Sequence, residues 1–438
     1  MPLILPLTKM TQFSFTSMNT TRPLRNPRLA ILDLFSGTSL NKTLAELRLQ
    51  QYLPPGELDD IRNAKLRHIF NLAKSTTDFY KDAISYEQLD VLTKETIRQN
   101  FNAFISKGYK KKLFAKGTGG STGIPLVYLT TAQVRSHLWA GIFLSWEAAG
   151  YTLGDKVAFI AGTSLTKSSL RHLAFYKVMN IDVYSAFTLD EVNIIKYLER
   201  LKQTKAKLIY GYSSALNVVA TYMNKVGGYY FPDLISIVST AEILTDGMRE
   251  NISRAFNVRV YNQYGCNEAG VSAFECQYNN MHLISSRSFF EVDKEANLIS
   301  TDLANEGFLM LRYHTGDRVK LSDIQNCPCK RTFPVIEDIV GRSFDIVRDA
   351  NNNVLHSAFF SLLFRDDTSI KQFQIQFDKK NLSVYLSVDK VGVDQQPYQH
   401  YIDVIRRHLQ FETYNLIINA PFLSSANAKH RHIINNGS

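Results

Sequence analysis

The feature that most constrains the fold is a regular alternation of strand-like and helix-like segments between residues 188 and 261. Short runs of apolar and β-branched residues predict buried strands, and the amphipathic stretches between them predict helices. The predicted strands are 208–210, 234–239 and 258–261, and the predicted helices are 188–201, 213–222 and 246–256. The first of these helices begins at a capping-box pattern, Thr188-Leu-Asp-Glu191. Such alternation is typical of an α/β sheet, mainly parallel, with ligand loops at the strand ends.

The segments on either side of this region predict further elements. Before it we expect helices within 44–82 and over 131–149, and a buried strand at 156–160. After residue 283 the pattern changes to shorter strands, at 289–292, 307–313 and 319–321. The last hundred residues predict strands within 345–355 and at 373–377, 382–388 and 414–418, with a helix at 398–409. We therefore expect a large α/β domain with several subdomains, followed by a small α+β domain.

The composition is that of a folded, water-soluble chain. Of 438 residues, 45% are hydrophobic and 21% are charged. The sequence contains no apolar run of the roughly 18–20 residues that span a bilayer, so we predict a cytoplasmic protein without membrane contact. The net charge of +10 comes from scattered basic residues that are dense only at 110–112, and no nucleic-acid motif accompanies them. We expect no nucleic-acid partner; the charge suits a solvated surface or polyanionic ligands.

Residues 116–126 form a loop of glycine and hydroxyl residues between a basic run and an apolar one. Glycine lets backbone N–H groups approach an anion closely, and hydroxyls add donors, so the loop suits a triphosphate. It is not a P-loop, because Ile124 stands where the lysine would follow the last glycine. A flexible surface turn has the same composition. The candidate phosphate-binding residues are Thr118, Gly119, Gly120, Ser121, Thr122 and Gly123.

Three further patterns follow in order: 261–268 directly after a predicted strand, 311–317, and 341–345. With the glycine loop, their order and spacing resemble the adenylate-forming enzymes, which include acyl-CoA synthetases, luciferases and adenylation domains. The detail resembles the phenylacetate–CoA ligase and capsular-polysaccharide-biosynthesis branch over about 44–432. Its hallmarks here are the Gly-Gly-Ser-Thr-Gly loop and the segments 211–214, 240–242, 275–282 and 327–329.

The resemblance implies roles for single residues. Glu268 is the expected Mg²⁺ ligand, Arg342 supports ribose and phosphate at the domain junction, and Lys429 is the mobile catalytic lysine. The implied domains are therefore 1–342, an AMP-binding domain whose first 30 residues are loosely ordered, and 343–438, a small mobile domain. The ATP-binding residues would be those of the glycine loop together with Ala241, Glu242, Tyr264, Gly265, Asp317 and Arg342. Tyr212, Ser213 and Ser214 would lie nearer the acyl group.

Three cysteines and one histidine form a separate set. Cys276, His282, Cys327 and Cys329 have the composition of a structural zinc site, and similar chains carry a similar set. Reduced free thiols are the alternative in a cytosolic protein. Cys266, inside the Tyr-Gly-Cys-Asn-Glu motif, is predicted to be a small packing residue.

The predicted function is ATP- and Mg²⁺-dependent activation of a small, aromatic carboxylic acid as its adenylate. The acyl group would pass to a thiol, either coenzyme A or the phosphopantetheine of an acyl carrier protein. An alternative is capture of the adenylate by an amine, which gives an amide. A second alternative is a non-catalytic family member, suggested by Ile124, Phe344 and Ala428 at positions where the family has other residues. A homodimer is compatible with the resemblance.

Overall fold

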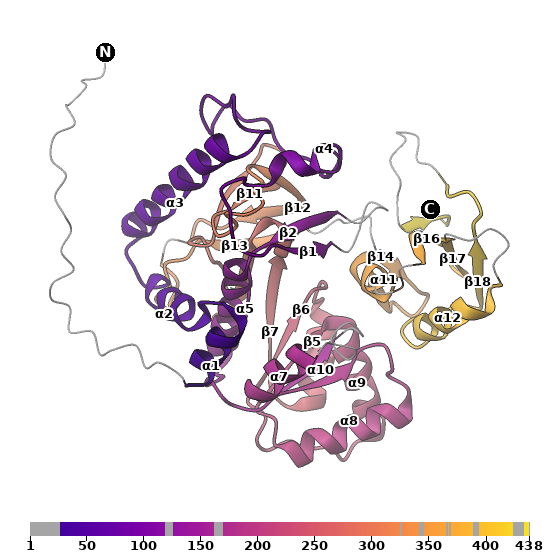
Figure 1. Ribbon diagram of the computed structural model, residues 1–438. Coiled ribbons are helices and arrows are strands. Elements are labelled where there is room, and N and C mark those ends of the chain that lie inside the picture. Colours follow the sequence, from indigo (N-terminus) through magenta and orange to yellow (C-terminus); the bar gives the residue numbers. More distant parts are fainter. Residues whose placement is uncertain are drawn as a thin grey trace, which may run out of the picture.

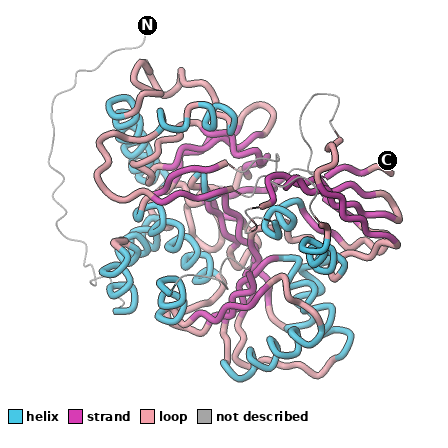
Figure 2. The backbone as a smooth tube through the Cα atoms, turned by 45° about the vertical axis from the view of Figure 1, so that its right-hand side comes forward, coloured by secondary structure: helices cyan, strands magenta, loops and turns pink. Residues whose placement is uncertain are grey.

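The computed structural model describes residues 27–437, apart from 119–125, 162–169, 325, 341–345, 365–366, 368, 389–393 and 424–432. An 11-stranded sheet dominates the chain, in the order β10-β11-β12-β13-β9-β8-β7-β6-β5-β3-β4. Figure 2 shows the strands running through the centre with helices outside them. The predicted α/β class is confirmed, and the large sheet proves to be mixed.

One half of the sheet, from β4 to β7, is parallel. Its strands are β3 (Val157–Ala161), β4 (Ile181–Ser185), β5 (Leu208–Tyr212), β6 (Ser236–Thr240) and β7 (Arg259–Cys266). The associated helices are α7 (Leu170–Val178), α8 (Glu191–Thr204), α9 (Ser213–Val226) and α10 (Asp246–Phe256). Every residue of β5 is buried, as expected of a strand covered on both faces. The elements α8 to α10 and β5 to β7 correspond to the predicted alternation and β3 to the predicted strand at 156–160, whereas α7 and β4 were not predicted.

The start of α8 differs from the prediction. The capping residue is Asp190, whose carboxylate accepts the backbone N–H of Asn193 at 2.9 Å. Thr188 instead pairs its hydroxyl with that of Tyr197 at 3.0 Å. The helix therefore begins at Glu191 and its N-cap lies two residues later than the capping-box pattern indicates, because an aspartate closer to the helix satisfies its free N–H groups.

The other half of the sheet is antiparallel from β7 to β10. Its strands are β8 (Val271–Glu275), β9 (Met281–Leu283), β10 (Ser288–Val292), β11 (Asn297–Asp302), β12 (Tyr313–Leu321) and β13 (Val335–Val340). The predicted strand at 307–313 is wrong, because Leu309 and Leu311 donate their N–H groups to the Phe104 carbonyl and the Tyr80 hydroxyl. The strand β11 was not predicted.

The N-terminal elements cover the antiparallel half and the middle of the sheet (Figure 1). They are α1 (Pro27–Ser36), α2 (Leu40–Gln50), α3 (Pro55–Thr76), α4 (Lys94–Gln99), η1 (Phe101–Phe104), the hairpin β1 (Phe114–Gly117) and β2 (Val127–Thr130), and α5 (Ala132–Ala148). Helix α5 buries Phe143 and Trp146 completely. An ion pair between Arg48 of α2 and Glu147 of α5 joins these two helices.

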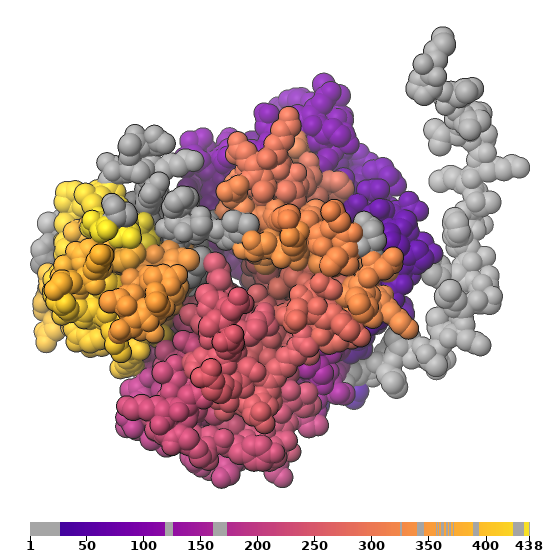
Figure 3. Space-filling model, turned by 180° about the vertical axis from the view of Figure 1, so that it is seen from behind, coloured from indigo at the N-terminus to yellow at the C-terminus, as the bar shows by residue number. Residues whose placement is uncertain are grey.

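The C-terminal elements form a four-stranded mixed sheet in the order β18-β17-β16-β19, with a separate hairpin, β14 and β15. The elements are β14 (Ile346–Arg348), β15 (Val354–His356), α11 (Ser357–Phe364), β16 (Ile370–Phe377), β17 (Asn381–Val388), η3 (Gln396–Tyr398), α12 (Gln399–Arg406), β18 (Thr413–Ile418) and β19 (Ile433–Asn435). Seen from behind, they lie beside the parallel half (Figure 3). Phe187 packs against Phe359 at this contact. The proposed junction at residue 342 lies outside the described residues and stays a prediction.

Within the described part of the chain, the helices are too short or too polar to cross a bilayer.

Candidate functional site

Strand register brings three of the sequence motifs together. Tyr212 at the end of β5 lies opposite Thr240 at the end of β6, and Thr240 lies opposite Gln263 of β7. The residues that follow this row are Ser213 and Ser214, Ala241 and Glu242, and Tyr264 and Gly265. The carboxyl ends of parallel strands are where open α/β sheets bind ligands. The predicted acyl and adenine residues therefore share one edge of the sheet.

Glu242 is held against the first turn of α9. One carboxylate oxygen accepts the backbone N–H of Ser214 at 2.8 Å, and the Ser213 hydroxyl lies 2.6 Å from that of Ser239. A helix N-terminus favours a carboxylate, but burial is the larger effect and raises the pKa of Glu242 to about 7. Its other oxygen, Oε1, is buried and has no hydrogen-bond partner among the described residues.

The backbone of Ala241, directly before Glu242, has an unusual conformation. Its φ of +68° lies in the left-handed region, which costs an L-residue on the order of 1 kcal/mol. Such strain at the end of a strand is common in binding sites. The turn directs the backbone so that the Glu242 side chain points back to α9.

The Tyr264 hydroxyl joins the second motif to the third. It donates a 2.7 Å hydrogen bond to the carboxylate of Asp317 in β12. Asp317 is held in turn through its backbone N–H, which donates to the Thr315 hydroxyl at 3.1 Å. Burial, together with the Asp317 charge, raises the pKa of Tyr264 well above its usual value, so the phenol stays protonated. Two residues from separate motifs thus form one polar unit.

Glu268 lies on the short helix η2 (Asn267–Ala269), directly after β7. Its side chain is half-buried, and no hydrogen bond or ion pair to another described residue engages its carboxylate. Mg²⁺ binds through one or two carboxylates together with substrate phosphates, and a carboxylate held at the edge of a site without a protein cation fits that role.

The base of the glycine loop is fixed by its first residue. Thr118 is buried, its N–H donates to the Leu126 carbonyl at 2.9 Å, and its hydroxyl accepts the Leu126 N–H at 3.1 Å. These bonds close the two ends of the loop. Several predicted site residues lie outside the described residues, namely Gly119, Gly120, Ser121, Thr122, Gly123, Arg342 and Lys429.

The sequence did not single out Gln263. Its side chain is buried within β7, at the last residue of the parallel pairing with β6, and its Oε1 has no donor partner among the described residues. A buried acceptor without a donor is costly, so it marks a place for a ligand donor or an ordered water. The only signal in the sequence was its position, directly before Tyr264 at a strand end.

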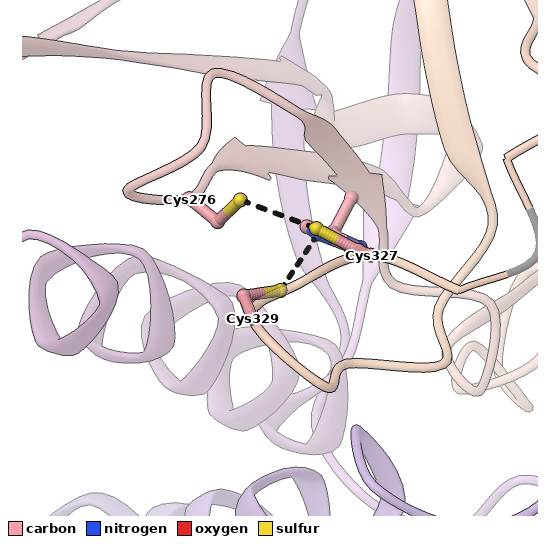
Figure 4. Close-up of side chains that lie close together, drawn as sticks. Cys276, Cys327 and Cys329 are labelled. Carbon is pink, nitrogen blue, oxygen red and sulfur yellow. Dashed lines mark hydrogen bonds between the residues drawn. The ribbon is translucent and has the colours of Figure 1, made fainter.

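The four predicted zinc ligands lie together in the antiparallel half. Cys276 follows β8, His282 lies in β9, and Cys327 and Cys329 precede β13. Their ligand atoms all lie within 4.8 Å of one another, and all four side chains are buried. The three thiols point toward one another (Figure 4). Cys276 Sγ lies 3.7 Å from Cys327 Sγ, and Cys329 Sγ lies 3.2 Å from His282 Nε2.

This geometry is compatible with zinc. Zinc–sulfur bonds of about 2.3 Å in a tetrahedron separate two sulfur atoms by roughly 3.8 Å. His282 Nδ1 contacts the Phe333 carbonyl at 3.1 Å, and this contact orients the ring so that Nε2 faces the sulfurs, as is common for metal-binding histidines. The side chain of Asn280 donates to Cys327 Sγ at 3.1 Å.

The thiol environments differ. Burial raises the pKa of Cys276 to about 11. Burial also acts on Cys327, but hydrogen bonds from Asn280 and Cys329 outweigh it and lower the pKa of that thiol. Cys266 lies apart from the cluster and packs into the apolar core, as predicted.

Comparison with solved structures identifies the fold. The chain has the fold of the acyl-CoA ligases that form adenylates. A crystal structure of 2-hydroxyisobutyryl-CoA ligase with 2-HIB-AMP and CoA in the thioesterification state superposes with a TM-score of 0.59 and 17% identity, over 89% of this chain and 92% of that one. The same ligase in the postadenylation state gives 0.56 and 16%, over 88% and 91%.

One protein is related at the level of sequence. Protein CapK of Staphylococcus aureus is 28% identical over 358 residues, which are 76% of this chain and 79% of that protein. No protein-family model matches the chain. The resemblance to the adenylate-forming enzymes, in the branch predicted from the motifs, is thereby confirmed.

Proposed function

We propose that the protein is an ATP-dependent ligase that activates a small carboxylic acid as its acyl-adenylate. The observation that carries this proposal is the contact between Tyr264 and Asp317, which unites two motifs 53 residues apart in the sequence beside the Tyr212–Thr240–Gln263 row. Forming an adenylate requires two anions, the carboxylate and the α-phosphate, to be held together. The glycine loop, the strand ends and Asp317 provide separate sites for them.

The described residues suit the parts of ATP. Tyr264 presents an aromatic ring for adenine, and its hydroxyl orients Asp317 toward the ribose hydroxyls. Ala241 and Glu242 line the adenine side, and Glu242 reaches Ser214 on the acyl side. The proposed adenine side and the proposed acyl side are therefore linked by this hydrogen bond at the first turn of α9. Thr118 anchors the loop whose backbone would hold the phosphates.

Glu268 is proposed to hold Mg²⁺, which when bound neutralises charge on the phosphate oxygens. Arg342 is proposed to contact ribose and phosphate. Lys429 is proposed to stabilise the negative charge on the α-phosphate as the carboxylate attacks. Both belong to the C-terminal side of the chain, so adenylation would require that part to approach the strand ends.

The Cys276, His282, Cys327 and Cys329 cluster is proposed to bind a structural zinc ion. Four buried protein ligands leave no coordination position for substrate, which distinguishes a structural site from a catalytic one. The ion would tie the loop before β13 to β8 and β9.

The acceptor is proposed to be a thiol of coenzyme A or of carrier-protein phosphopantetheine. The relatives that share the fold include a CoA ligase with bound CoA, which supports this choice. The acid is proposed to be small and aromatic, in a cytoplasmic setting. Phe344, one of the positions where the family has another residue, lies outside the described residues.

Pyrophosphate release with ATP, Mg²⁺ and a panel of aryl and short-chain acids tests the proposal. We expect acid-dependent release that falls by roughly two to three orders of magnitude in Lys429→Ala, because a preorganised charge at the reacting phosphate is lost. Lys380→Ala is the matched control, because that lysine lies in the same part of the chain, is exposed, and pairs with the exposed Glu412. Release that is independent of the acid, or equal in both variants, would contradict the proposal.

A second assay identifies the acceptor. Purified enzyme with its preferred acid receives coenzyme A, a phosphopantetheinylated carrier protein or a primary amine, and the products are identified by mass spectrometry. We expect a thioester. An amide as the main product would contradict the thiol acceptor and identify an amine as the acceptor. Accumulation of the adenylate with all three acceptors would support adenylation but contradict transfer to any of them.

A further inference from the structure

The turn that carries Glu268 packs against the end of β11. The hydroxyl of Ser300 donates a buried 2.8 Å hydrogen bond to the carbonyl of Ala269, the residue after Glu268. One residue further, Gly270 ends η2 with a φ of +71°. The turn after Glu268 therefore lies against β11 at two consecutive residues, Ala269 and Gly270.

Gly270 touches Asp302 so closely that no other residue fits. A Cβ at Gly270 would lie 2.6 Å from the carboxyl carbon of Asp302, well inside any real contact distance. The left-handed φ adds a second reason for glycine. The position of η2 is thus set by where the Asp302 carboxylate lies.

Asp302 is itself fixed from two sides. Its Oδ1 accepts the N–H of Ala304 at 2.9 Å, and its Oδ2 faces the guanidinium of Arg287 at 3.9 Å. Arg287 is only 1% exposed, and its Nη1 donates to the Ser272 hydroxyl at 3.1 Å. Its carbonyl also accepts the N–H of Leu303, next to Asp302 in sequence. Arg287 Nε and Nη2 have no hydrogen-bond partner among the described residues, so the bonds to Ala304, Ser272 and Leu303 are what fix the pair.

Strand β2, which follows the glycine loop in the sequence, is joined to the segment after Asp302. The side chain of Asn305 donates a 3.0 Å hydrogen bond to the carbonyl of Leu129 in β2. Burial raises the pKa of the neighbouring Tyr128, and the charges of Glu268 and Asp302 add to this effect. The loop and the carboxylate are both expected to bind the phosphate end of ATP, so their relative position matters.

We propose that Asp302, paired with Arg287, is a positioning residue that sets the Glu268 carboxylate for Mg²⁺ by fixing the turn at Gly270. Ser300 has the same role through the Ala269 carbonyl. The inference rests on the proposed function, because it assigns Glu268 to Mg²⁺. Neither Asp302 nor Ser300 needs to touch ATP or the acid.

The test measures pyrophosphate release against Mg²⁺ concentration at saturating ATP and acid. We expect Asp302→Asn to raise the half-saturating Mg²⁺ concentration about tenfold, the usual size of a second-shell effect, and to leave the KM for the acid unchanged. Excess Mg²⁺ should restore most of the rate. A merely structural role would lower the thermal midpoint without moving the Mg²⁺ dependence.

Two further variants keep the test decisive. Asp349→Asn is the matched control, because Asp349 is also buried and accepts backbone N–H groups from Asn351, Asn353 and Gln410, all in the C-terminal part of the chain. It should lower stability and leave the half-saturating Mg²⁺ concentration unchanged. Ser300→Ala removes one bond without unpairing a charge, so it should fold if Asp302→Asn does not, with an expected rise of about threefold.

Glu268→Gln separates this inference from the proposed function. If Glu268→Gln leaves the Mg²⁺ dependence unchanged, the metal role of Glu268 is wrong, and the proposed mechanism fails at that point. If Glu268→Gln shifts the dependence but Asp302→Asn and Ser300→Ala do not, the positioning role alone is overturned.

Discussion

The two halves of the large sheet differ in where their polar side chains lie. In the parallel half the polar residues lie at or beyond the last residues of the parallel pairing, and two acceptors there, Glu242 Oε1 and Gln263 Oε1, have no partner within the described residues. In the antiparallel half the polar residues lie in and between strands, and Cys276, Cys329 and His282 face one another. The first half thus contains unpaired buried acceptors, and the second encloses thiols and an imidazole together.

The difference follows from strand direction. Parallel strands all end at one edge, so residues distant in sequence gather there without covering it. Antiparallel strands return directly, so β8, β9 and the loop before β13 bring side chains to face each other in the interior. Chemistry is expected at the first kind of place and structural support at the second.

The largest effect that would sharpen this contrast is loss of the cluster. Cys276→Ser should remove bound zinc and cost several kcal/mol of stability, because a structural zinc site stabilises the fold directly. Zinc content by elemental analysis and the thermal midpoint measure this. Cys266→Ser, at a buried cysteine outside the cluster, is the control and should keep its zinc. A metal-free wild type of full stability would instead make these residues reduced thiols.

The second effect is at the contact between Tyr264 of β7 and Asp317 of β12, where the two halves of the sheet meet in the site. Asp317→Asn keeps the shape and the contact with Tyr264 but removes a negative charge, so adenylation should fall by about 10²-fold or more with little change in the thermal midpoint. Acid-dependent pyrophosphate release measures it. Tyr264→Phe removes only the hydroxyl and should have a smaller effect. A variant that loses stability but not activity would assign Asp317 to the fold.

Sequence patterns predicted the parallel half well for a physical reason. The strands predicted there are short apolar runs, and α8 and α10 have side-chain caps from the local sequence, so α10 has the predicted bounds, 246–256. The strand-end residues could be found because motif and strand end coincide. The contact between Glu242 and Ser214 could not, since it depends on the register of β5 and β6.

The antiparallel half was predicted poorly because tertiary contacts determine its strands. Strand β11 contains Ser300 and Thr301, which look like loop residues in sequence. Both are buried, with the first bonded to the Ala269 carbonyl and the second to the Tyr86 hydroxyl. Residues 307–313 show the reverse, an apolar run that reads as a strand but bonds to irregular segments. The four cluster residues were found by residue type, but their distances were not.

The third effect is a pH dependence at Glu242. Its pKa is about 7 in the folded protein and 4.5 ordinarily, so folding favours the protonated form. The associated stability is fully present below pH 4.5 and is lost as pH rises through 7. Glu242→Gln should therefore gain stability relative to wild type between pH 5 and pH 8, measured by chemical unfolding. The exposed Glu337→Gln should show no such trend. Parallel pH curves for wild type and Glu242→Gln would show that the carboxyl titrates normally.

The smallest effect tests where α8 begins in the parallel half. Asp190→Ala should cost about 1 kcal/mol, because it leaves the N–H of Asn193 without its cap. Thr188→Ala removes only a hydroxyl contact with Tyr197 and should cost less than half as much. Urea unfolding of both variants at pH 7 makes the comparison. Asp190 also lies 3.8 Å from Arg407 of the C-terminal part, so Arg407→Ala is measured alongside. If Arg407→Ala loses as much stability as Asp190→Ala, the aspartate acts through the ion pair and not as a cap. If Thr188→Ala loses more stability than Asp190→Ala, Thr188 is the capping residue, as the sequence predicted.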